Sequence, residues 1–389
     1  MMNALTRNRA ILVSSVLIAY RQLAHQCAGK HWRSSGWFLL GVDGSRLTTP
    51  RTRSNEEAFC AKNYGHGKRA KYGKKKSQGL RRKRNKQHQE KITPQVPQVF
   101  LTMIWHMQLR LPWVWKAGRS SSSERCDTTE LFENHSFPEK TLLCGDAGFT
   151  GYEFWKKIID QGADFLVRVG ANVSLLSDEV DIEQQQGGTV LCWPQKMRGK
   201  FPPLQLRLVR VKVGKTDMWM LTSVLDEGEL TDEQIIKTYK MRWLIEVEFR
   251  GLKQTLDRVK LKCRNSERVY VEVDWALLAM GVAELMATQQ QIAQSEQSPD
   301  AMANYTPRHR SLAKTIKAIR YCLRNLNRWA NAENNLLEHL AAAVVQNYKN
   351  STDKRARYSH KNSDVKPLGD PKVQPIDDQI AERLPMQTA

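Results

Sequence analysis

Residues 239–253 read YKMRWLIEVEFRGLK, a stretch that combines a helical apolar pattern with four polar groups at fixed spacing. The four are Tyr239, Arg242, Glu246 and Lys253, at offsets of 0, 3, 7 and 14. At about 100° per residue they fall within about 60° of one another, on the border of the apolar face. The stretch therefore predicts a helix that presents a phenol, two cations and a carboxylate along one edge.

This helix has a clear expected start. Thr231 is followed three residues later by Gln234, which is the spacing of a capping box, so one helix is predicted over 231–257. Glu248 falls about 160° from Glu246 on the helical wheel and is a poor substitute for it. A solvated helix edge with charge pairs at i,i+4 is the plain alternative, so partners elsewhere in the chain must decide.

The composition indicates the size of the fold and the kind of molecule that the protein binds. The chain has 389 residues, 41% of them hydrophobic, which is enough for one large domain or two smaller ones. Its 61 lysines and arginines exceed its 40 acidic residues, for a formal net charge of +21. This excess favours nucleic acid ahead of an anionic membrane. Seven cysteines without a C-x-x-C spacing disfavour a disulfide framework and a zinc ribbon, and favour a reducing, intracellular compartment.

Much of the positive charge lies in one segment. Residues 62–91 hold thirteen lysines and arginines against a single acid, Glu90. The segment has few large apolar residues, so it is predicted to be an exposed basic arm that binds phosphates. A targeting segment and a solvated loop are the alternatives. The cations singled out for DNA binding are Lys74, Lys75, Lys76, Arg81, Arg82, Lys83 and Arg84.

Two apolar runs are candidates for membrane-spanning segments. Residues 10–20, AILVSSVLIAY, follow two arginines like the core of a signal peptide, but they are too short to span a bilayer and no cleavage site follows. They are predicted to form a buried helix. Residues 276–287 carry Glu284 and are typical of a core helix. Neither run predicts a membrane protein.

Two short apolar runs end in aspartate. WFLLGVD closes at Asp43 and TLLCGD closes at Asp146, and glycine-containing turns follow both. Buried strands are expected there, with the carboxylates at the strand ends. Further strands are expected at 99–107, 111–117 and 163–170, and a strand-rich region at 171–225. Helices are expected at about 147–162, 270–292, 307–330 and 333–348, and a disordered tail from 349.

Two strand-end aspartates and one glutamate on a late helix can converge on divalent cations. Oxygen ligands alone suit Mg²⁺ or Mn²⁺. Two such ions clamp the attacking and leaving oxygens of a phosphoryl transfer, and the basic arm would hold DNA beside them.

The combination resembles the DDE transposases of the insertion-sequence-four family, which is defined by a Tyr-x2-Arg-x3-Glu-x6-Lys motif. Residues 239–253 match it at all four positions, and the segment before the second aspartate, WHMQLRLPWVWKAGRSSSSER, is also similar. The family's aspartate contexts are matched by Asp43-Gly44-Ser45 and by Asp146-Ala147-Gly148-Phe149. The resemblance covers about 37–290, roughly two-thirds of the chain.

The resemblance implies an α/β fold, with a ribonuclease H-like mixed sheet flanked by helices and a β-rich insertion before the last catalytic helix. The expected division is a short helical region at 1–36, the first part of the core at 37–170 with the basic insertion 62–91, the insertion at 171–225, the rest of the core at 226–292, a helical region at 293–348 and a disordered tail at 349–389.

The resemblance also implies a function, namely metal-dependent cleavage of double-stranded DNA at element ends and strand transfer into target DNA. Asp43, Asp146 and Glu246 would hold two Mg²⁺ or Mn²⁺ ions. DNA contacts would come from Tyr239, Arg242, Lys253 and Trp243, of which Trp243 either stacks on a displaced base or packs in the core.

A bacterial, nucleoid-associated cytoplasmic protein that forms a homodimer in a synaptic complex is the matching expectation. The chain departs from the family in its short region, some 40 residues, before the first aspartate. A nuclease or resolvase of the same fold, and a decayed remnant that only binds DNA, are the rival interpretations.

Overall fold

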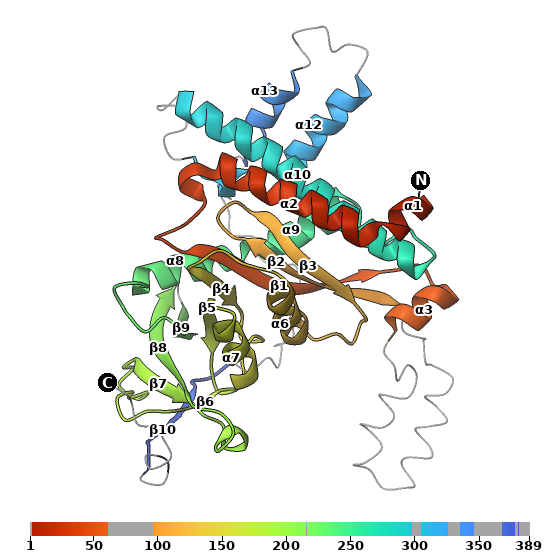
Figure 1. Ribbon diagram of the computed structural model, residues 1–389. Coiled ribbons are helices and arrows are strands. Elements are labelled where there is room, and N and C mark those ends of the chain that lie inside the picture. The colour runs from red at the N-terminus through yellow and green to blue at the C-terminus, as the bar shows by residue number, and fades with distance from the viewer. Residues whose placement is uncertain are drawn as a thin grey trace, which may run out of the picture.

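The structure is a computed structural model that describes residues 2–60, 96–214, 216–297, 305–325, 335–345, 368–377 and 380. These residues form one large mixed sheet with helices on both faces (Figure 1). The basic arm, with the seven cations singled out above (Lys74, Lys75, Lys76, Arg81, Arg82, Lys83 and Arg84), lies outside the described residues.

Ten strands make up the sheet in the order β10-β6-β7-β8-β9-β5-β4-β1-β2-β3. Parallel pairing joins β1 to β4, β4 to β5 and β10 to β6, while the other neighbours are antiparallel. The strands are β1 Phe38–Thr48, β2 Gln98–His106, β3 Leu111–Gly118, β4 Thr141–Gly145, β5 Asp164–Val169, β6 Ser174–Leu176, β7 Gly188–Cys192, β8 Leu204–Val213, β9 Thr216–Thr222 and β10 Lys372–Gln374.

The described helices cover the sheet and extend beyond it (Figure 1). The α-helices are α1 Met2–Arg7, α2 Arg9–Ala28, α3 Arg53–Phe59, α6 Glu124–Asn134, α7 Tyr152–Asp160, α8 Asp232–Arg242, α9 Leu244–Arg250, α10 Ser266–Gln297, α12 Leu312–Arg324 and α13 Leu336–Ala341. Short turns of other helix types are η1 Gly29–His31, η2 Gln195–Met197, the π-helical η3 Gly251–Thr255 and η4 Pro307–His309.

The alternation of side chains along β1 separates two cores. Phe38, Leu40 and Val42 pack in the core that includes α6 and α7, whereas Leu39 and Leu47 pack in the core that includes α8, α9 and α10. Successive residues of a strand point to opposite faces. Asp43 has the same parity as Leu39 and Leu47, so it lies on the face that α8 and α9 cover.

Asp43 does not end its strand. The sequence predicted a strand that closes at Asp43, but β1 continues to Thr48 because β2 pairs with it as far as Thr48↔Gln98. The parallel partner β4 stops earlier, at Gly145. Asp43 therefore lies at the point where β1 runs on past β4, with Met103 of β2 as its antiparallel partner.

The predicted helix over 231–257 exists but is not continuous. Its capping box is confirmed: the Gln234 backbone N–H donates to Thr231 Oγ1 at 3.3 Å, and the Thr231 N–H donates to Gln234 Oε1 at 3.1 Å. The chain breaks at Trp243 into α8 and α9, and it then forms η3. The helical wheel used for residues 239–253 assumes one regular helix, so the angles that it gives for residues after Trp243 are approximate.

The strand-rich character predicted for 171–225 agrees with β6, β7, β8 and β9. These strands are continuous with the main sheet, because β9 pairs with β5 from Leu166↔Thr222 to Val169↔Trp219. The expected disordered tail also differs from the structure at 368–377. Within that segment β10 pairs with β6, and Trp219 Nε1 donates to Asp370 Oδ1 at 2.9 Å.

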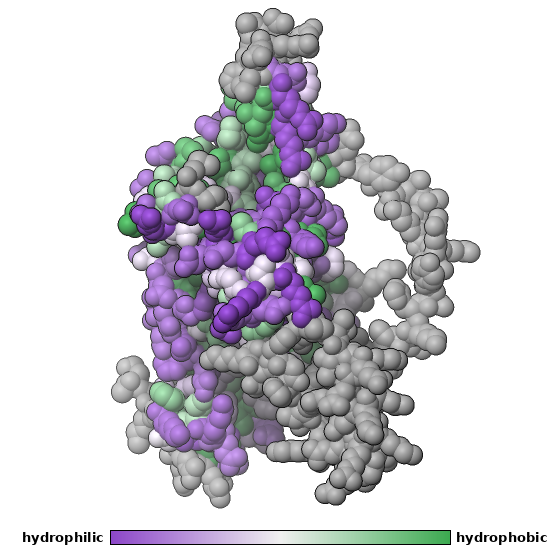
Figure 2. Space-filling model, turned by 90° about the vertical axis from the view of Figure 1, so that its right-hand side faces the viewer, coloured by the Kyte–Doolittle hydropathy of each residue, from purple (hydrophilic) through white to green (hydrophobic). Residues whose placement is uncertain are grey.

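The first apolar run is helical, as predicted, but only partly buried. It forms the first half of α2, in which Leu17 and Tyr20 are buried while Ile11 and Ile18 are exposed. Among the described helices none is long and apolar enough to cross a membrane. Hydrophilic residues dominate the described part of the face in Figure 2.

Candidate active site

Asp43 and Asp146 are brought together by the register of β1 and β4. The two strands pair in parallel from Phe38↔Thr141 to Gly41↔Cys144. Extending this register by two residues along each chain places Asp43 beside Asp146. Neighbouring strands lie about 5 Å apart. Each carboxylate is oriented by its own turn.

These turns hold the aspartate oxygens through backbone donors. The Gly44 N–H donates to Asp43 Oδ1 at 2.8 Å, and the Gly148 N–H donates to Asp146 Oδ1 at 2.7 Å. A Cβ at position 148 would lie 2.9 Å from Asp146 Oδ1, so glycine leaves room there for the carboxylate.

The electrostatic surroundings of Asp43 place Glu246 in the same cluster. Burial raises the pKa of the Asp43 carboxyl to about 6, and the nearby carboxylates of Asp146 and Glu246 act in the same direction. The Gly44 N–H and the Arg242 guanidinium oppose this rise. The charges of Asp146, in the turn after β4, and of Glu246, on α9, therefore both act on Asp43, and the joint role of the three residues stays a prediction.

Arg242 is the arginine whose charge acts on both aspartates of this cluster. Burial lowers its pKa, but interactions with Tyr239, Cys144, Asp146 and Asp43 outweigh burial and raise it. Its guanidinium carbon lies 5.4 Å from the centre of the Tyr239 ring. Burial in turn raises the pKa of the half-buried Tyr239 phenol.

Lys253 reaches the cluster from the π-helical turn. Burial lowers the pKa of its ammonium group, and the charge of Asp43 opposes that shift. Trp243 differs, because its side chain is 58% exposed at the break between α8 and α9. Of the two predicted roles for Trp243, packing in the core is therefore excluded.

Glu124 joins the cluster although no pattern in the sequence selected it. It is the first residue of α6, and burial, Asp43 and Asp146 all raise the pKa of its carboxyl group. A Cβ at Gly44 would clash with Glu124 Oε1, and one at Gly148 would lie 4.0 Å from Glu124 Oε2. The signal in the sequence that could have selected Glu124 is its place as an acidic residue at the start of a helix that precedes the second aspartate.

The donor set is compatible with Mg²⁺ or Mn²⁺, although it is not a closed cage. Among the described residues, no three acidic, histidine or cysteine side chains are arranged to hold an ion in this conformation. Mg²⁺ keeps several waters and usually needs only one or two carboxylates. The oxygen chemistry of the two aspartate side chains fits such an ion.

One protein-family model matches the central segment of the chain. Residues 118–281 match the family model described as "Transposase DDE domain". The match includes Asp146 and residues 239–253 but begins after Asp43. No curated protein matches the chain.

A solved structure, described as the cryo-EM structure of the piggyBac transposase synaptic complex with hairpin DNA, aligns with a TM-score of 0.37 and 10% identity. The alignment covers 82% of this chain and 59% of that chain. A similarity of this size does not establish a common fold. The family match rests on residues 118–281, which are similar to the transposase DDE domain and make up about two-fifths of the chain.

Proposed function

We propose that the chain is a DNA transposase that cleaves double-stranded DNA at element ends and joins the freed 3′-hydroxyl to target DNA. One observation supports the proposal: Asp43 lies beside Asp146 in the register of β1 and β4, and the charge of Glu246 acts on it, in a chain whose residues 118–281 match the transposase DDE domain. The spacing within 239–253 supports membership of the insertion-sequence-four family.

We also propose a ribonuclease H-like core. The sheet order β3-β2-β1-β4-β5, with β2 antiparallel to both its neighbours and β1, β4 and β5 parallel, supports this assignment. The core would consist of 37–170 and 226–292, interrupted by the strand-rich insertion 171–225. The flanking regions 1–36 and 293–348 would be helical additions.

Asp43, Asp146 and Glu246 would hold one or two Mg²⁺ or Mn²⁺ ions. When bound, these ions would activate a water or hydroxyl nucleophile and stabilise the leaving oxygen of an in-line displacement. The protein contributes the orientation of its ligands: the N–H groups of Gly44 and Gly148 fix the two aspartates before any ion arrives. Preorganised ligands of this kind need little rearrangement during the reaction.

The DNA backbone would lie along the edge formed by α8, α9 and η3. Arg242 suits a bidentate contact with a phosphate and Lys253 a single charge contact, with Tyr239 beside them. The exposure of Trp243 supports stacking on a displaced base. The cations of the basic arm would add further phosphate contacts, and two copies of the chain would pair two DNA ends.

The test uses labelled DNA that carries the sequences flanking the gene. Wild-type protein, Glu246→Gln and the control Glu233→Gln, an exposed acid on α8, are each incubated with Mn²⁺. We expect cleavage and strand joining by the wild type and the control only. Cleavage without joining would instead identify a nuclease or resolvase. Salt-sensitive binding without cleavage by any of the three proteins would identify a remnant that only binds DNA.

A further inference from the structure

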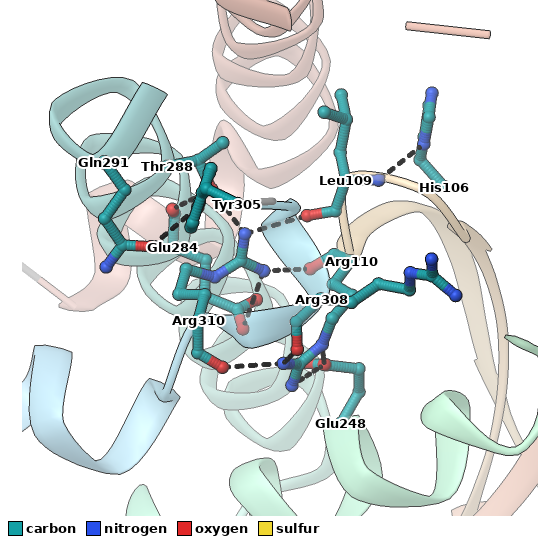
Figure 3. A network of polar contacts seen from close by, with 10 residues as sticks. All are labelled: His106, Leu109, Arg110, Glu248, Glu284, Thr288, Gln291, Tyr305, Arg308 and Arg310. Atoms are coloured by element: carbon teal, nitrogen blue, oxygen red, sulfur yellow. Dashed lines mark hydrogen bonds and ion pairs between the residues drawn. The ribbon is translucent and has the colours of Figure 1, made fainter. Parts of the chain in front are cut away.

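Two buried arginine–glutamate contacts belong to one network, and one of them includes Glu248 of α9 (Figure 3). Arg110 Nη2 lies 2.6 Å from Glu248 Oε1, and the two side chains are 4% and 1% exposed. Arg310 Nη2 lies 3.1 Å from Glu284 Oε1, with both side chains fully buried. The sequence pattern predicted that Glu284 lies in a core helix and that Glu248 points away from the site. It did not select Arg110 or Arg310.

The two arginines also tie distant parts of the backbone together. Arg110 Nη1 donates to the carbonyl oxygens of Arg308 at 3.1 Å and of Arg310 at 2.7 Å. In return, Arg310 donates to the carbonyl oxygens of Leu109 at 2.8 Å and of Arg110 at 2.6 Å. The β2–β3 turn and the segment after η4 are therefore fixed to each other by side chains that solvent does not reach.

Arg110 is held in an unusual backbone conformation by these contacts. Its φ is +55°, in the left-handed region that side-chain-bearing residues seldom adopt. The residue directs its guanidinium into the protein, where Nε donates to Glu248 Oε1 at 2.8 Å. Glu248 thus meets a rigid partner that approaches from the sheet side of the molecule.

Helix α9 depends on such outside contacts for its orientation. It has seven residues, and the break at Trp243 separates it from α8. A helix this short has little stability of its own, so tertiary contacts decide where it lies. Ile245 and Phe249 anchor α9 in the core, and Glu248 adds the one buried ion pair that a described α9 residue makes.

Glu246 and Glu248 are two residues apart on this helix, which separates them by about 200° around its axis. Glu248 points to Arg110, and Glu246 lies on the side of Asp43 and Asp146. A rotation of α9 that moved Glu248 away from Arg110 would also turn Glu246 away from the aspartates.

We propose that the Arg110–Glu248 pair positions Glu246, so that its carboxylate faces Asp43 and Asp146 before a divalent ion binds. The inference rests on the proposed function of that site and adds two positioning residues to it. Partners that orient a metal ligand from behind commonly affect metal affinity without touching the metal.

The test separates positioning from general stability by comparing two buried carboxylates of the same network. Glu248→Gln weakens the pair behind α9, whereas Glu284→Gln changes the pair on α10. Burial, reinforced by the charge of Glu248 and by a side-chain hydrogen bond to it, raises the pKa of Glu284 to about 8. Glutamine resembles the neutral form of Glu284 that prevails at pH 7, and it retains a polar group beside Glu248 and Arg310. A second variant, Glu248→Asp, keeps the charge and shortens the side chain in case Glu248→Gln does not fold.

Full-length proteins are compared by hydrogen–deuterium exchange over residues 244–250 and by calorimetric titration with Mn²⁺. We expect both Glu248 variants to exchange faster over 244–250 and to bind Mn²⁺ about tenfold more weakly. Glu284→Gln should match the wild type in both measurements.

Three results would count against specific claims. Wild-type exchange over 244–250 in a folded Glu248→Gln protein would overturn the inference, as would an unchanged Mn²⁺ affinity. Equal effects of Glu248→Gln and Glu284→Gln would reduce the pair to a general structural role and would also overturn it. If the wild type bound no Mn²⁺, the proposed metal site would fail, and the exchange rates over 244–250 alone would decide whether Glu248 positions α9.

Discussion

Asp43 and Asp146 become neighbours because β1 and β4 run parallel in a register that places them side by side, one residue past the end of β4. The two residues are 103 positions apart in sequence (146 minus 43). A shift of one residue in this register would turn Asp43 to the face of α6 and α7. The pairing of two strands thus determines whether the candidate site exists.

The raised pKa of Asp43 leads to a prediction about pH and stability. The carboxyl has a pKa of about 6 in the folded protein against an ordinary value of 3.8, so the folded state holds this proton more tightly than the unfolded state. Its contribution to the free energy of unfolding is therefore present below pH 4 and is lost as the pH rises to about 6. Discounted for partial exposure, the loss is about 1–2 kcal/mol.

Asp43→Asn should remove that loss and raise the free energy of unfolding at pH 7, as measured by denaturant titration at several pH values without divalent ions. The control is Asp257→Asn, an exposed position with a φ of +55° that asparagine tolerates. The same pH dependence in Asp43→Asn as in the wild type would contradict the assignment.

Arg242 should contribute to DNA affinity through its geometry as well as its charge. Arg242→Lys keeps the charge but loses the bidentate donor, and we expect binding to weaken about fivefold with an unchanged dependence on salt. Arg242→Gln should also reduce the slope of log affinity against log salt by about one.

Fluorescence anisotropy with labelled duplex DNA over a range of salt concentrations measures both quantities. Lys240→Gln provides the control, because Lys240 is exposed and lies about 200° from Arg242 around α8. A salt slope that falls equally in the Lys240 and Arg242 glutamine variants would indicate only a general loss of charge.

Gly44 should tolerate no side chain, because two groups occupy the space that a Cβ would need. A Cβ there would clash with Glu124 Oε1 and would lie 2.7 Å from Phe100 Cζ. Glu124 can move, but Phe100 is buried in β2. We therefore expect Gly44→Ala to lower the free energy of unfolding by about 1–3 kcal/mol.

Chemical denaturation of Gly44→Ala, of Glu124→Ala and of the double variant tests this packing. The double variant should recover part of the loss, since it removes one of the two clashes. Gly228→Ala, in an exposed loop, should change stability much less. A Gly44→Ala protein as stable as the wild type would show that β1 does not pass this close to α6.

The capping box of α8 should contribute measurably to stability. Thr231→Ala removes the acceptor for the Gln234 N–H, which typically costs about 1 kcal/mol, whereas Thr231→Ser keeps the acceptor and should remain close to the wild type. Thermal unfolding followed by circular dichroism would measure both variants. Equal melting temperatures for alanine and serine would mean that the cap does not hold α8 in the intact protein.

Local pattern predicted many of the elements, but not α3, α6 or β10. Short apolar runs predicted β1, β4 and β5, the capping box predicted the start of α8, and the spacing within 239–253 selected Tyr239, Arg242, Glu246 and Lys253. These features depend on residues close together in the chain. The choice of Asp43, Asp146 and Glu246 as metal ligands came from the resemblance to a known family, and it stays a prediction.

Tertiary structure decided what local pattern could not. The full length of β1 depends on β2, and the single helix predicted over 231–257 divides at Trp243 into α8 and α9. The order at 368–377 depends on β6 and on Trp219, which lie about 150 or more residues away in sequence. Hydropathy alone predicted disorder there, because the segment is polar and contains prolines.

The sequence by itself determined where many of the strands and helices lie and which chemical groups residues 239–253 carry, because both follow from local periodicity and spacing. Only the tertiary structure placed Glu124 beside Asp43 and set Arg110 behind Glu248. Each of these pairings joins residues that are far apart in the chain. The physical reason is that the distance between such residues is set by folding and not by local spacing. The buried charge of Glu248 is tolerated because folding brings it the opposite charge of Arg110.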